Sequence, residues 1–352
     1  MARPLQFAAL CAMLIVADVG VALAGGWHAV AFLYHRFGEC RYPSTSVTLE
    51  QFEAHLEYLE AEDYNVWPLE RIIEHKQSGK TVPDRTVAIT IDDAYLSVYK
   101  EAYPRLRERG FPFIVFVATD AIDNREGAIM DWQQMREMQD NGASFGNHSA
   151  SHDHLVRRKG GESETDYRKR VRDDLKKARQ RMAEELDADA IAPLFAYPYG
   201  EYNAVVAAIA GDLGYVSFGQ HSGVIGPHGD DRALPRFAMA EAYADIDEFA
   251  RKASAKALPV VRLEPWEPRL DANNPPRMRA ELANSGARLE QLACFVSRHG
   301  QVDVQWDDRE ARIFSVRAPG PLPTGRSRYN CTAPSEEDGR FYWFSQQWLV
   351  LP

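Results

Sequence analysis

The alternation of short apolar segments with helical patterns, from about residue 28 to residue 256, constrains this chain more than any other feature. Apolar positions such as Leu175, Ala178 and Met182 recur at helical spacing between the segments. Such alternation favours a parallel sheet with helices packed outside it. Seven strands are too many for a small open sheet and favour a barrel, complete or incomplete. The strand candidates are AVAFLYH (29–35), TVAITID (86–92), PFIVFVA (112–118), ASFGNH (143–148), PLFAYP (193–198), YVSFG (215–219) and LPRFAM (234–239).

The pattern changes after a Pro-rich stretch, residues 263–276, which contains EPWEP and NNPPR. Short strand-like runs separated by turns follow, without a long helical pattern. We therefore expect a barrel at 25–262, a linker at 263–276 and a small all-β, sandwich-like domain at 277–352. The runs are RLEQLACFVS, QVDVQWD, ARIFSVR, SRYNCTA and RFYWFSQQWLVL.

The first 24 residues have the pattern of a secretory leader. Arg3 supplies the positive start, residues 5–16 are almost wholly apolar, and Ala22-Leu23-Ala24 matches a cleavage site. The apolar run is too short to span a bilayer, which disfavours the alternative of a membrane anchor. We expect a signal peptide at 1–24, a periplasmic or secreted mature protein, and no stable membrane insertion after cleavage.

Three cysteines remain after the leader: Cys40, Cys294 and Cys331. In an oxidising compartment two of them can pair. Cys294 and Cys331 both lie in strand-like runs of the β-domain, and a bridge there would stabilise the domain by roughly 4 kcal/mol on the loop-entropy model. We predict this disulfide, with Cys40 left over; the alternative is three free thiols.

The chain has 51 acidic and 41 basic residues, and its formal net charge is -10. Nucleic acids and other anionic polymers favour basic surfaces. We therefore expect a neutral or cationic partner and no nucleic acid. The sequence indicates no oligomeric state.

Polar side chains gather at the C-terminal ends of the predicted strands, where active sites of parallel barrels form. The first strand ends at His35, the second at the adjacent Asp92 and Asp93, and the fourth at His148, with His152 following. On a helical turn, a spacing of four puts both imidazoles on one face. A carboxylate would complete three protein ligands for a metal ion and leave a position for water. Its neighbour would remain for proton transfer.

Each motif also has a simpler interpretation. A pair of Asp residues at a strand end can cap the next helix, and His-x-x-x-His is often a polar helix face. Two histidines and one carboxylate also suit non-haem iron, so an iron enzyme is an alternative. The adjacent second Asp and the leader argue against iron.

TIDDAY (90–95), HSASH (148–152) and FAYPYG (195–200) resemble the three leading motifs of the polysaccharide deacetylases, the chitooligosaccharide-deacetylase homology family of carbohydrate esterases. Together with LYHRFG (33–38), they look most like the branch that includes exported poly-β-1,6-N-acetylglucosamine deacetylases. The resemblance spans roughly residues 30–239. It implies a deformed (β/α)7 barrel, in agreement with the strand count.

The resemblance implies metal-dependent hydrolysis of N-acetyl groups on an exported N-acetylhexosamine polysaccharide, with release of acetate. Asp92 falls on the family's general base. Asp93, His148 and His152 fall on its metal ligands, and the ligand types favour zinc as the divalent metal. A protein that keeps this fold but only binds carbohydrate is the non-enzymatic alternative.

The Pro-Tyr motif of the family falls on Pro198 and Tyr199, and the main-chain N–H of the tyrosine helps to hold the oxyanion. Two positions depart from the family pattern. Ala94 stands where a glycine usually follows the Asp pair. Tyr197 stands where many members carry an arginine, which leaves the orientation of Asp92 unexplained.

The general acid needs a separate assignment, because the family's late Leu-x-His motif is not evident in LPRFAM (234–239). His35 and His154 remain as candidates once the ligands are assigned. His154 is two residues past His152 and would point away from the site on a helix. His35 ends the strand expected beside the one that carries Asp92. We predict His35 as the general acid; a structural histidine is the alternative.

Aromatic residues near the motifs provide candidate sugar contacts. We expect Tyr197, Pro198 and Trp132 to contact substrate, since aromatic rings such as Trp132, Tyr197 and Tyr202 can stack on sugars. Burial of the same rings in the core is the alternative.

Overall fold

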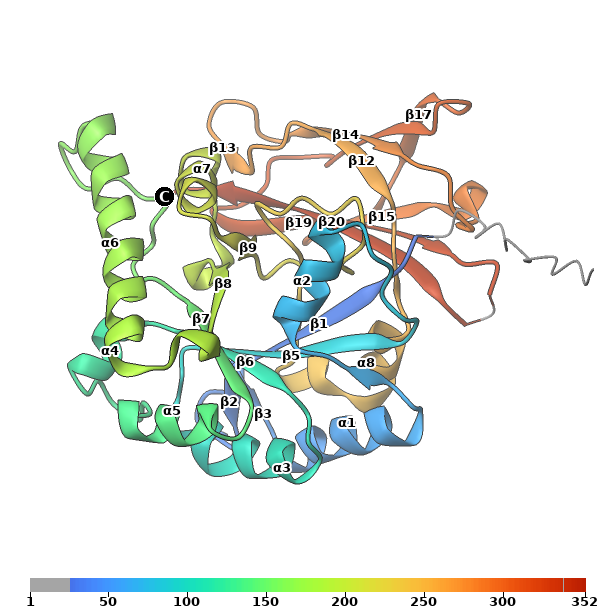
Figure 1. Ribbon diagram of the computed structural model, residues 1–352. Helices are drawn as coiled ribbons and strands as arrows, with labels where there is room; N and C mark the ends of the chain where they lie inside the picture. Colours follow the sequence, from blue (N-terminus) through green and yellow to red (C-terminus); the bar gives the residue numbers. More distant parts are fainter. Residues whose placement is uncertain (1–25, 338) are drawn as a thin grey trace, which may run out of the picture.

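The computed structural model, which describes residues 26–337 and 339–352, is built on a sheet of seven parallel strands (Figure 1). All seven strands predicted from the sequence are present. The two edges of the sheet are β9 and β10, so it forms an incomplete, deformed (β/α)7 barrel. A short strand, β4 (Asn65–Val66), pairs with β5. In spatial order the seven are β10 (Phe237–Ala238), β1 (Ala29–Tyr34), β5 (Thr86–Asp92), β6 (Phe113–Val117), β7 (Ala143–Asn147), β8 (Ile191–Ala196) and β9 (Val216–Phe218).

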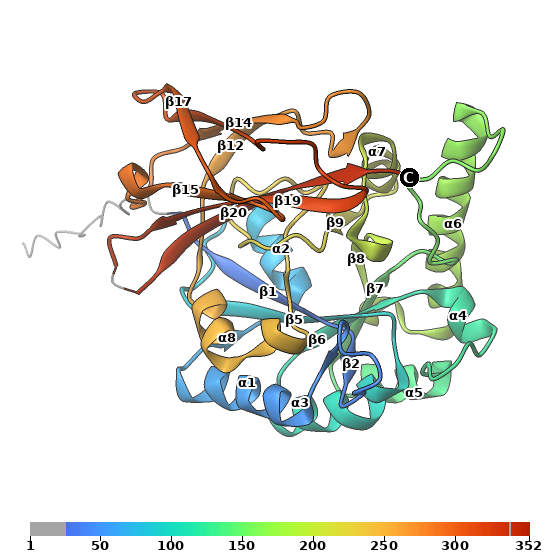
Figure 2. The same cartoon turned by 180° about the vertical axis from the view of Figure 1, so that it is seen from behind.

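Most of the helices cover the outside of the barrel sheet, as Figures 1 and 2 show from opposite sides, whereas α2 packs on the other face, with Ala29 and Ala31 of β1. The predicted helix around Leu175 is α6, which buries its apolar face and exposes its charged residues. A π-helical turn over residues 98–102 leads into α3. The helices are α1 (Leu49–Ala61), α2 (Leu69–Gln77), α3 (Tyr103–Glu108), α4 (Thr119–Asp123), α5 (Trp132–Gln139), α6 (Glu164–Glu185), α7 (Ala204–Asp212) and α8 (Ile246–Ala253).

The strands of the barrel are buried on both faces, which is typical of parallel sheets covered by helices. All seven residues of β5 and all six of β1 are buried. β5 pairs with β1 on one side and with β6 on the other. The charged end of β5 at Asp92 is therefore held in a rigid, central position of the sheet.

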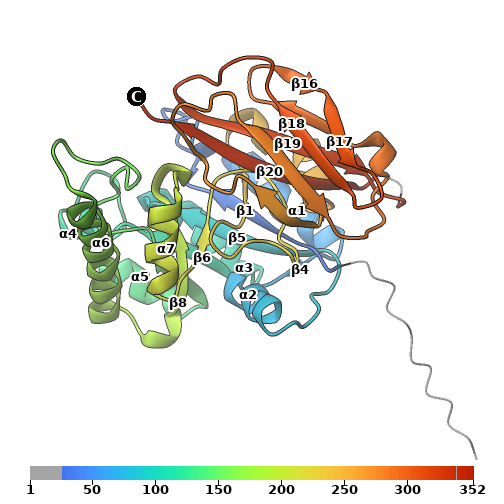
Figure 3. The same cartoon turned by 90° about the horizontal axis from the view of Figure 1, so that it is seen from above.

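The C-terminal region is a β-domain of two facing sheets that share one core (Figure 3). One sheet has the order β11-β20-β19-β15-β16, with β13 beside β20, and the other has the order β12-β14-β18-β17. The predicted boundary at residue 262 falls inside β12, which pairs with β14. The strands are β11 (Lys256–Ala257), β12 (Val260–Glu264), β13 (Arg269–Leu270), β14 (Arg277–Leu282), β15 (Ala293–Val296), β16 (Gly300–Val302), β17 (Val304–Asp308), β18 (Ile313–Arg317), β19 (Gly325–Pro334) and β20 (Phe341–Val350).

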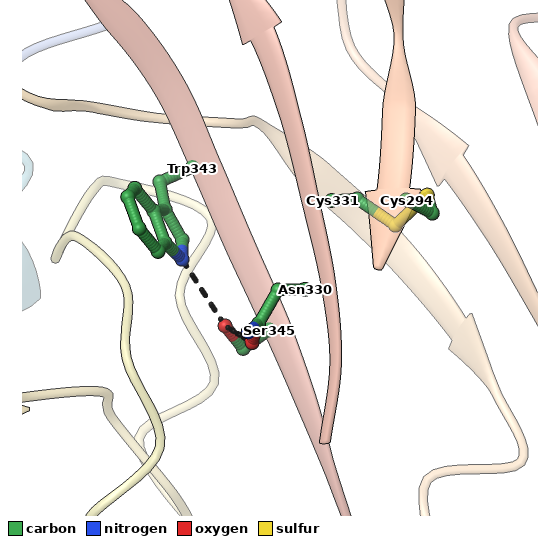
Figure 4. Close-up of a disulfide and its surroundings, with 5 residues drawn as sticks. All are labelled: Cys294, Asn330, Cys331, Trp343 and Ser345. Carbon is green, nitrogen blue, oxygen red and sulfur yellow. Dashed lines mark hydrogen bonds between the residues drawn. A yellow bond between two sulfur atoms is a disulfide. The ribbon is translucent and has the colours of Figure 1, made fainter. Parts of the chain in front are cut away.

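The predicted disulfide is confirmed. Cys294 of β15 lies directly opposite Cys331 of β19, and their sulfurs are bonded (Figure 4). Both residues are fully buried in the core of the β-domain. Cys40 is free and exposed, so the alternative of three free thiols is wrong.

The expected signal peptide, residues 1–24, lies outside the residues that the structure describes. Over residues 26–337 and 339–352, no helix combines the length and the apolar character that a bilayer crossing requires. Export and leader cleavage remain predictions.

Candidate active site

The structure brings together the three residues proposed as metal ligands. Asp93 follows β5, and His148 and His152 follow β7. The Nε2 atoms of His148 and His152 lie 3.3 and 3.1 Å from Asp93 Oδ1. One ligand atom from each of the three residues lies within 4.8 Å of the other two. The cluster therefore has the size of a single metal site.

Two buried atoms of this cluster support a bound cation. Asp93 Oδ1 and His148 Nε2 make no hydrogen bond to any described residue, although burying a polar atom without a partner is costly. His148 Nδ1 donates to Ala196 O over 2.8 Å, so in the neutral imidazole Nε2 carries the lone pair, and this atom lies on the side of Asp93. A divalent metal at the centre would bind both atoms, so these residues fit one.

The ionisation of Asp93 agrees with this arrangement. Burial alone would raise the pKa of the Asp93 carboxyl, but His148 and His152 outweigh it and hold the pKa well below its ordinary value. A carboxylate that remains ionised while buried is the form that binds a metal.

The segment that carries the two histidines is a loop rather than the helical turn predicted from the spacing. Ser149 and His152 have positive φ angles of 65° and 53°. Asn147 Oδ1 accepts a hydrogen bond from Ser149 N, and Ser149 Oγ accepts one from His152 N. The side chains of Asn and Ser thus fold the loop locally and bring the imidazoles together without a helix.

Asp92 makes a different set of contacts, and its main partner was missed in the sequence. Arg236, immediately before β10, donates from Nη1 to Asp92 Oδ1 (2.7 Å) and from Nη2 to Oδ2 (2.9 Å). Both side chains are fully buried. Arg236 also donates to Thr90 Oγ1 and Gly219 O. This bidentate pair fixes the orientation of Asp92.

Arg236 orients Asp92, although Tyr197 stands at the position where many family members carry an arginine. The orientation of Asp92, unexplained from the sequence, is thereby explained. Burial alone would raise the pKa of Asp92, but the Arg236 guanidinium, with help from His148 and His35, lowers it below its ordinary value. Arg236 belongs to LPRFAM, the segment in which the family resemblance implies a histidine. The sequence feature that could have identified Arg236 is its charge within an otherwise apolar predicted strand.

The two candidate acids, His35 and His154, lie in different surroundings. His35 follows β1 directly and is half-buried. Burial lowers the pKa of His35, against the opposing charges of Asp93 and Asp92. The register of β1 and β5 pairs Tyr34 with Ile91, so His35 and Asp92 are the next residues on adjacent strands. His154 Nδ1 lies 2.8 Å from Glu201 Oε2, and its ring stacks on Tyr199. His154 therefore belongs to the rim of the site.

A family model described as polysaccharide deacetylase matches residues 79–218. Residues 79–218 of this chain are therefore similar to the polysaccharide deacetylases. A poly-β-1,6-N-acetyl-D-glucosamine N-deacetylase of Staphylococcus epidermidis is 28% identical over 202 residues, which are 55% of this chain and 68% of that protein. A putative polysaccharide deacetylase of Bacillus subtilis is 28% identical over 173 residues, so the match spans 49% of this chain and 57% of that relative.

Solved structures show the same fold. The deacetylase PplD of Streptococcus pyogenes superposes with a TM-score of 0.57 at 20% identity, covering 65% of this chain and 99% of that one. IcaB from Ammonifex degensii gives a TM-score of 0.56 at 23% identity, covering 65% and 98%. About a third of the present chain therefore lies outside each of these matches.

The backbone of the barrel accounts for the first departure from the family motif. Asp93 and Ala94 both have positive φ angles, 74° and 54°. Glycine adopts this region without strain, which explains its usual place after the Asp pair. Here Ala94 takes the same conformation, and it is fully buried beneath the site.

The Pro-Tyr motif lies at the mouth of the metal cluster. Tyr199 has a φ of 58° and is 38% exposed, and its ring lies 4.6 Å from that of His152. Pro198 before it is buried. The motif thus places Tyr199 beside the cluster, whereas Pro198 supports the turn.

The other two proposed sugar contacts are buried in the core of the barrel. Tyr197 is fully buried, and its hydroxyl donates to Arg232 O. The indole N–H of Trp132 donates to Asp123, and only 9% of Trp132 is exposed. Neither ring has a free face on which a sugar could stack, and Tyr202 is buried as well. The core interpretation fits these three residues.

A cavity of about 360 Å³ lies elsewhere, where the barrel segment 221–235 faces β12 and β20. Of the residues named above as ligands, acid or base candidates or sugar contacts, only Tyr202 lines it. The proposed metal ligands and Asp92 thus lie apart from this cavity.

Proposed function

We propose that this chain is a metal-dependent N-deacetylase that releases acetate from an exported N-acetylhexosamine polysaccharide. The unequal setting of two adjacent carboxylates carries this proposal. Asp92 has both oxygens bonded to Arg236, whereas Asp93 turns one oxygen toward His148 and His152. One carboxylate is thereby suited to move a proton and the other to bind a metal. The names of the staphylococcal relatives support the class of substrate.

Zinc suits the ligand set of one carboxylate and two imidazoles, and when bound it polarises the acetyl carbonyl and lowers the pKa of water. Asp92, kept ionised and oriented by Arg236, accepts a proton from the water that attacks the carbonyl carbon. The backbone N–H of Tyr199 donates to the oxyanion of the tetrahedral intermediate. The C–N bond then breaks as His35 donates a proton to the departing amine nitrogen, and acetate is released.

Acetate release from a defined panel of glycans tests this function. The purified protein is incubated with β-1,6- and β-1,4-linked N-acetylglucosamine oligomers, and acetate, free amine and bound metal are measured. We expect acetate and amine in equal amounts, together with about one divalent metal per chain. Bound metal without acetate from any oligomer would favour a carbohydrate-binding protein.

A further inference from the structure

One face of the β-domain sheet that contains β19 and β20 is turned toward the barrel. Along β19, Ser327, Tyr329 and Cys331 are buried in the β-domain core, while the alternate residues lie on the other face. Figure 4 shows Asn330 on this other face, hydrogen-bonded to Ser345 of β20. Ser345 Oγ in turn lies 3.3 Å from Ser222 Oγ of the barrel.

Arg326 and Arg328 belong to the same barrel-facing row, at the end of β19 nearest the active site. In the register of the hairpin, Arg328 lies opposite Gln347. Gln347 Nε2 donates to Gly200 O over 2.7 Å. This row therefore meets the barrel at the residue that directly follows Tyr199.

A second contact places Arg326 at the same point. Arg326 Nη1 donates to Gln220 Oε1 over 2.9 Å. Gln220 packs so closely on Gly200 that a Cβ there would lie 2.6 Å from Gln220 Cβ. Arg326 is thus connected through Gln220 to Gly200, the residue after Tyr199, whose ring centroid lies 4.6 Å from that of the proposed ligand His152.

Arg326 and Arg328 have no counterion among the described residues, since no carboxylate there lies within 4 Å of either guanidinium. Glu201, the acidic group that acts on Arg326, is already bonded to His154. Arg326 bonds a neutral amide, and no hydrogen bond from the Arg328 side chain to a described residue is formed.

Two like charges on one strand face repel each other. Arg328 is half-buried, which makes its unpaired charge more costly and lowers its pKa, whereas Arg326 is exposed. Such a pair is stabilised by an anion that bonds both. Guanidinium groups bind planar carboxylates and phosphates through paired N–H donors.

We propose that Arg326 and Arg328 form a subsite for an oxyanion, a carboxylate or phosphate, carried by a sugar near the one that is deacetylated. This inference rests on the proposed deacetylase function and gives the β-domain a part in substrate selection. It differs from the neutral or cationic partner expected from the net charge of -10. Charges beyond about 10 Å are screened by salt, whereas these two act at contact distance.

The test compares three N-acetylglucosamine oligosaccharides that are alike except for one neighbouring sugar: neutral, glucuronate-bearing or phosphate-bearing. Wild type should show a KM at least about tenfold lower for one of the charged oligomers than for the neutral one at low salt. Whichever charged oligomer shows the lower KM identifies the anion. The Arg326→Gln/Arg328→Gln double variant should lose this difference and keep its kcat on the neutral oligomer. Arg309→Gln, an exposed arginine of the same domain, is the matched control and should behave as wild type.

Equal KM values for all three oligomers in wild type, with acetate released, would overturn the subsite and leave the proposed function intact. Binding is measured separately by calorimetry with the two charged oligomers. Binding that the double variant loses, without acetate from any oligomer, would support the subsite and overturn the deacetylase function. Equal binding by wild type and the double variant would overturn the subsite.

Discussion

The barrel and the β-domain handle charge in opposite ways at the face they share. In the barrel, the buried Asp92 and Arg236 satisfy each other through two hydrogen bonds. In the β-domain, Arg326 and Arg328 lie on the facing sheet with no carboxylate partner among the described residues.

This difference distinguishes charges that stabilise the fold, as in the Asp92–Arg236 pair, from charges that are available to bind a ligand, as in Arg326 and Arg328. A buried pair that is internally satisfied fixes geometry, and removing one member leaves the other uncompensated. A guanidinium without a partner contributes little to folding and retains its donors for an external group. Stability measurements should therefore separate the two kinds of arginine.

The largest stability effect should come from Arg236→Met. It leaves the Asp92 carboxylate buried without its counterion, so the free energy of unfolding should fall by about 3–5 kcal/mol. Arg326→Gln and Arg328→Gln should stay within about 0.5 kcal/mol of wild type. Chemical denaturation followed by circular dichroism measures all three. Equal losses of unfolding free energy in Arg236→Met and Arg328→Gln would contradict the distinction between paired and unpaired arginines.

Within the barrel, His35 and His154 are the two candidates for the general acid, and their variants should differ. His35→Ala should keep its metal and lose deacetylation by about a hundredfold or more, because the amine would leave without a general acid. His154→Ala is the matched control and should stay close to wild type in acetate release and metal content. An essential His154 with a dispensable His35 would reverse the assignment of the acid.

The β-domain should depend on its disulfide. Replacing Cys294 and Cys331 together with Ala should lower the stability of this domain by about 4 kcal/mol, since the bridge closes a long loop in the unfolded chain. Thermal unfolding without reductant measures the loss, and Cys40→Ala should have little effect. Peptide mapping that finds both thiols free would contradict the bridge.

The pH dependence of stability should come partly from His55, a fully buried residue of α1. Burial lowers the pKa of His55 to about 4, despite its hydrogen bond to Ala244 O. Above pH 6.5 the residue is neutral in both states. As the pH falls from 6.5 to about 4, only the unfolded chain gains the proton, so stability falls by about 3 kcal/mol. His55→Gln should remove this part of the slope between pH 7 and 4, and an unchanged slope would contradict it.

The proposed metal cluster could be predicted from the sequence because the C-terminal ends of parallel strands lie at the same edge of a sheet. Asp93 and His148 could be assigned from their positions at strand ends, without knowledge of the loops. The local structure could not be assigned in the same way. The i, i+4 spacing predicted a helical turn, whereas positive φ angles at Ser149 and His152 fold the segment as a loop.

Contacts between segments that lie far apart in the chain could not be predicted from the sequence. Arg236 lies 144 residues from Asp92, and only the closure of the sheet brings them together. The exposure of Tyr197 and Trp132 was likewise undetermined, because an aromatic residue suits a core as well as a sugar site. The seven strands and the β-domain were predictable because their periodicity is local.

The central claim is that two neighbouring carboxylates have different tasks, and one paired measurement tests it. Asp92→Asn and Asp93→Asn are compared for bound metal and for acetate release from the glycan oligomer that wild type hydrolyses fastest, with circular dichroism to confirm folding. We expect Asp92→Asn to retain its metal and lose turnover by about a hundredfold or more, since the base is gone. Asp93→Asn should lose metal and turnover together. Equal metal loss in both variants, or near-wild-type turnover in Asp92→Asn, would contradict the account.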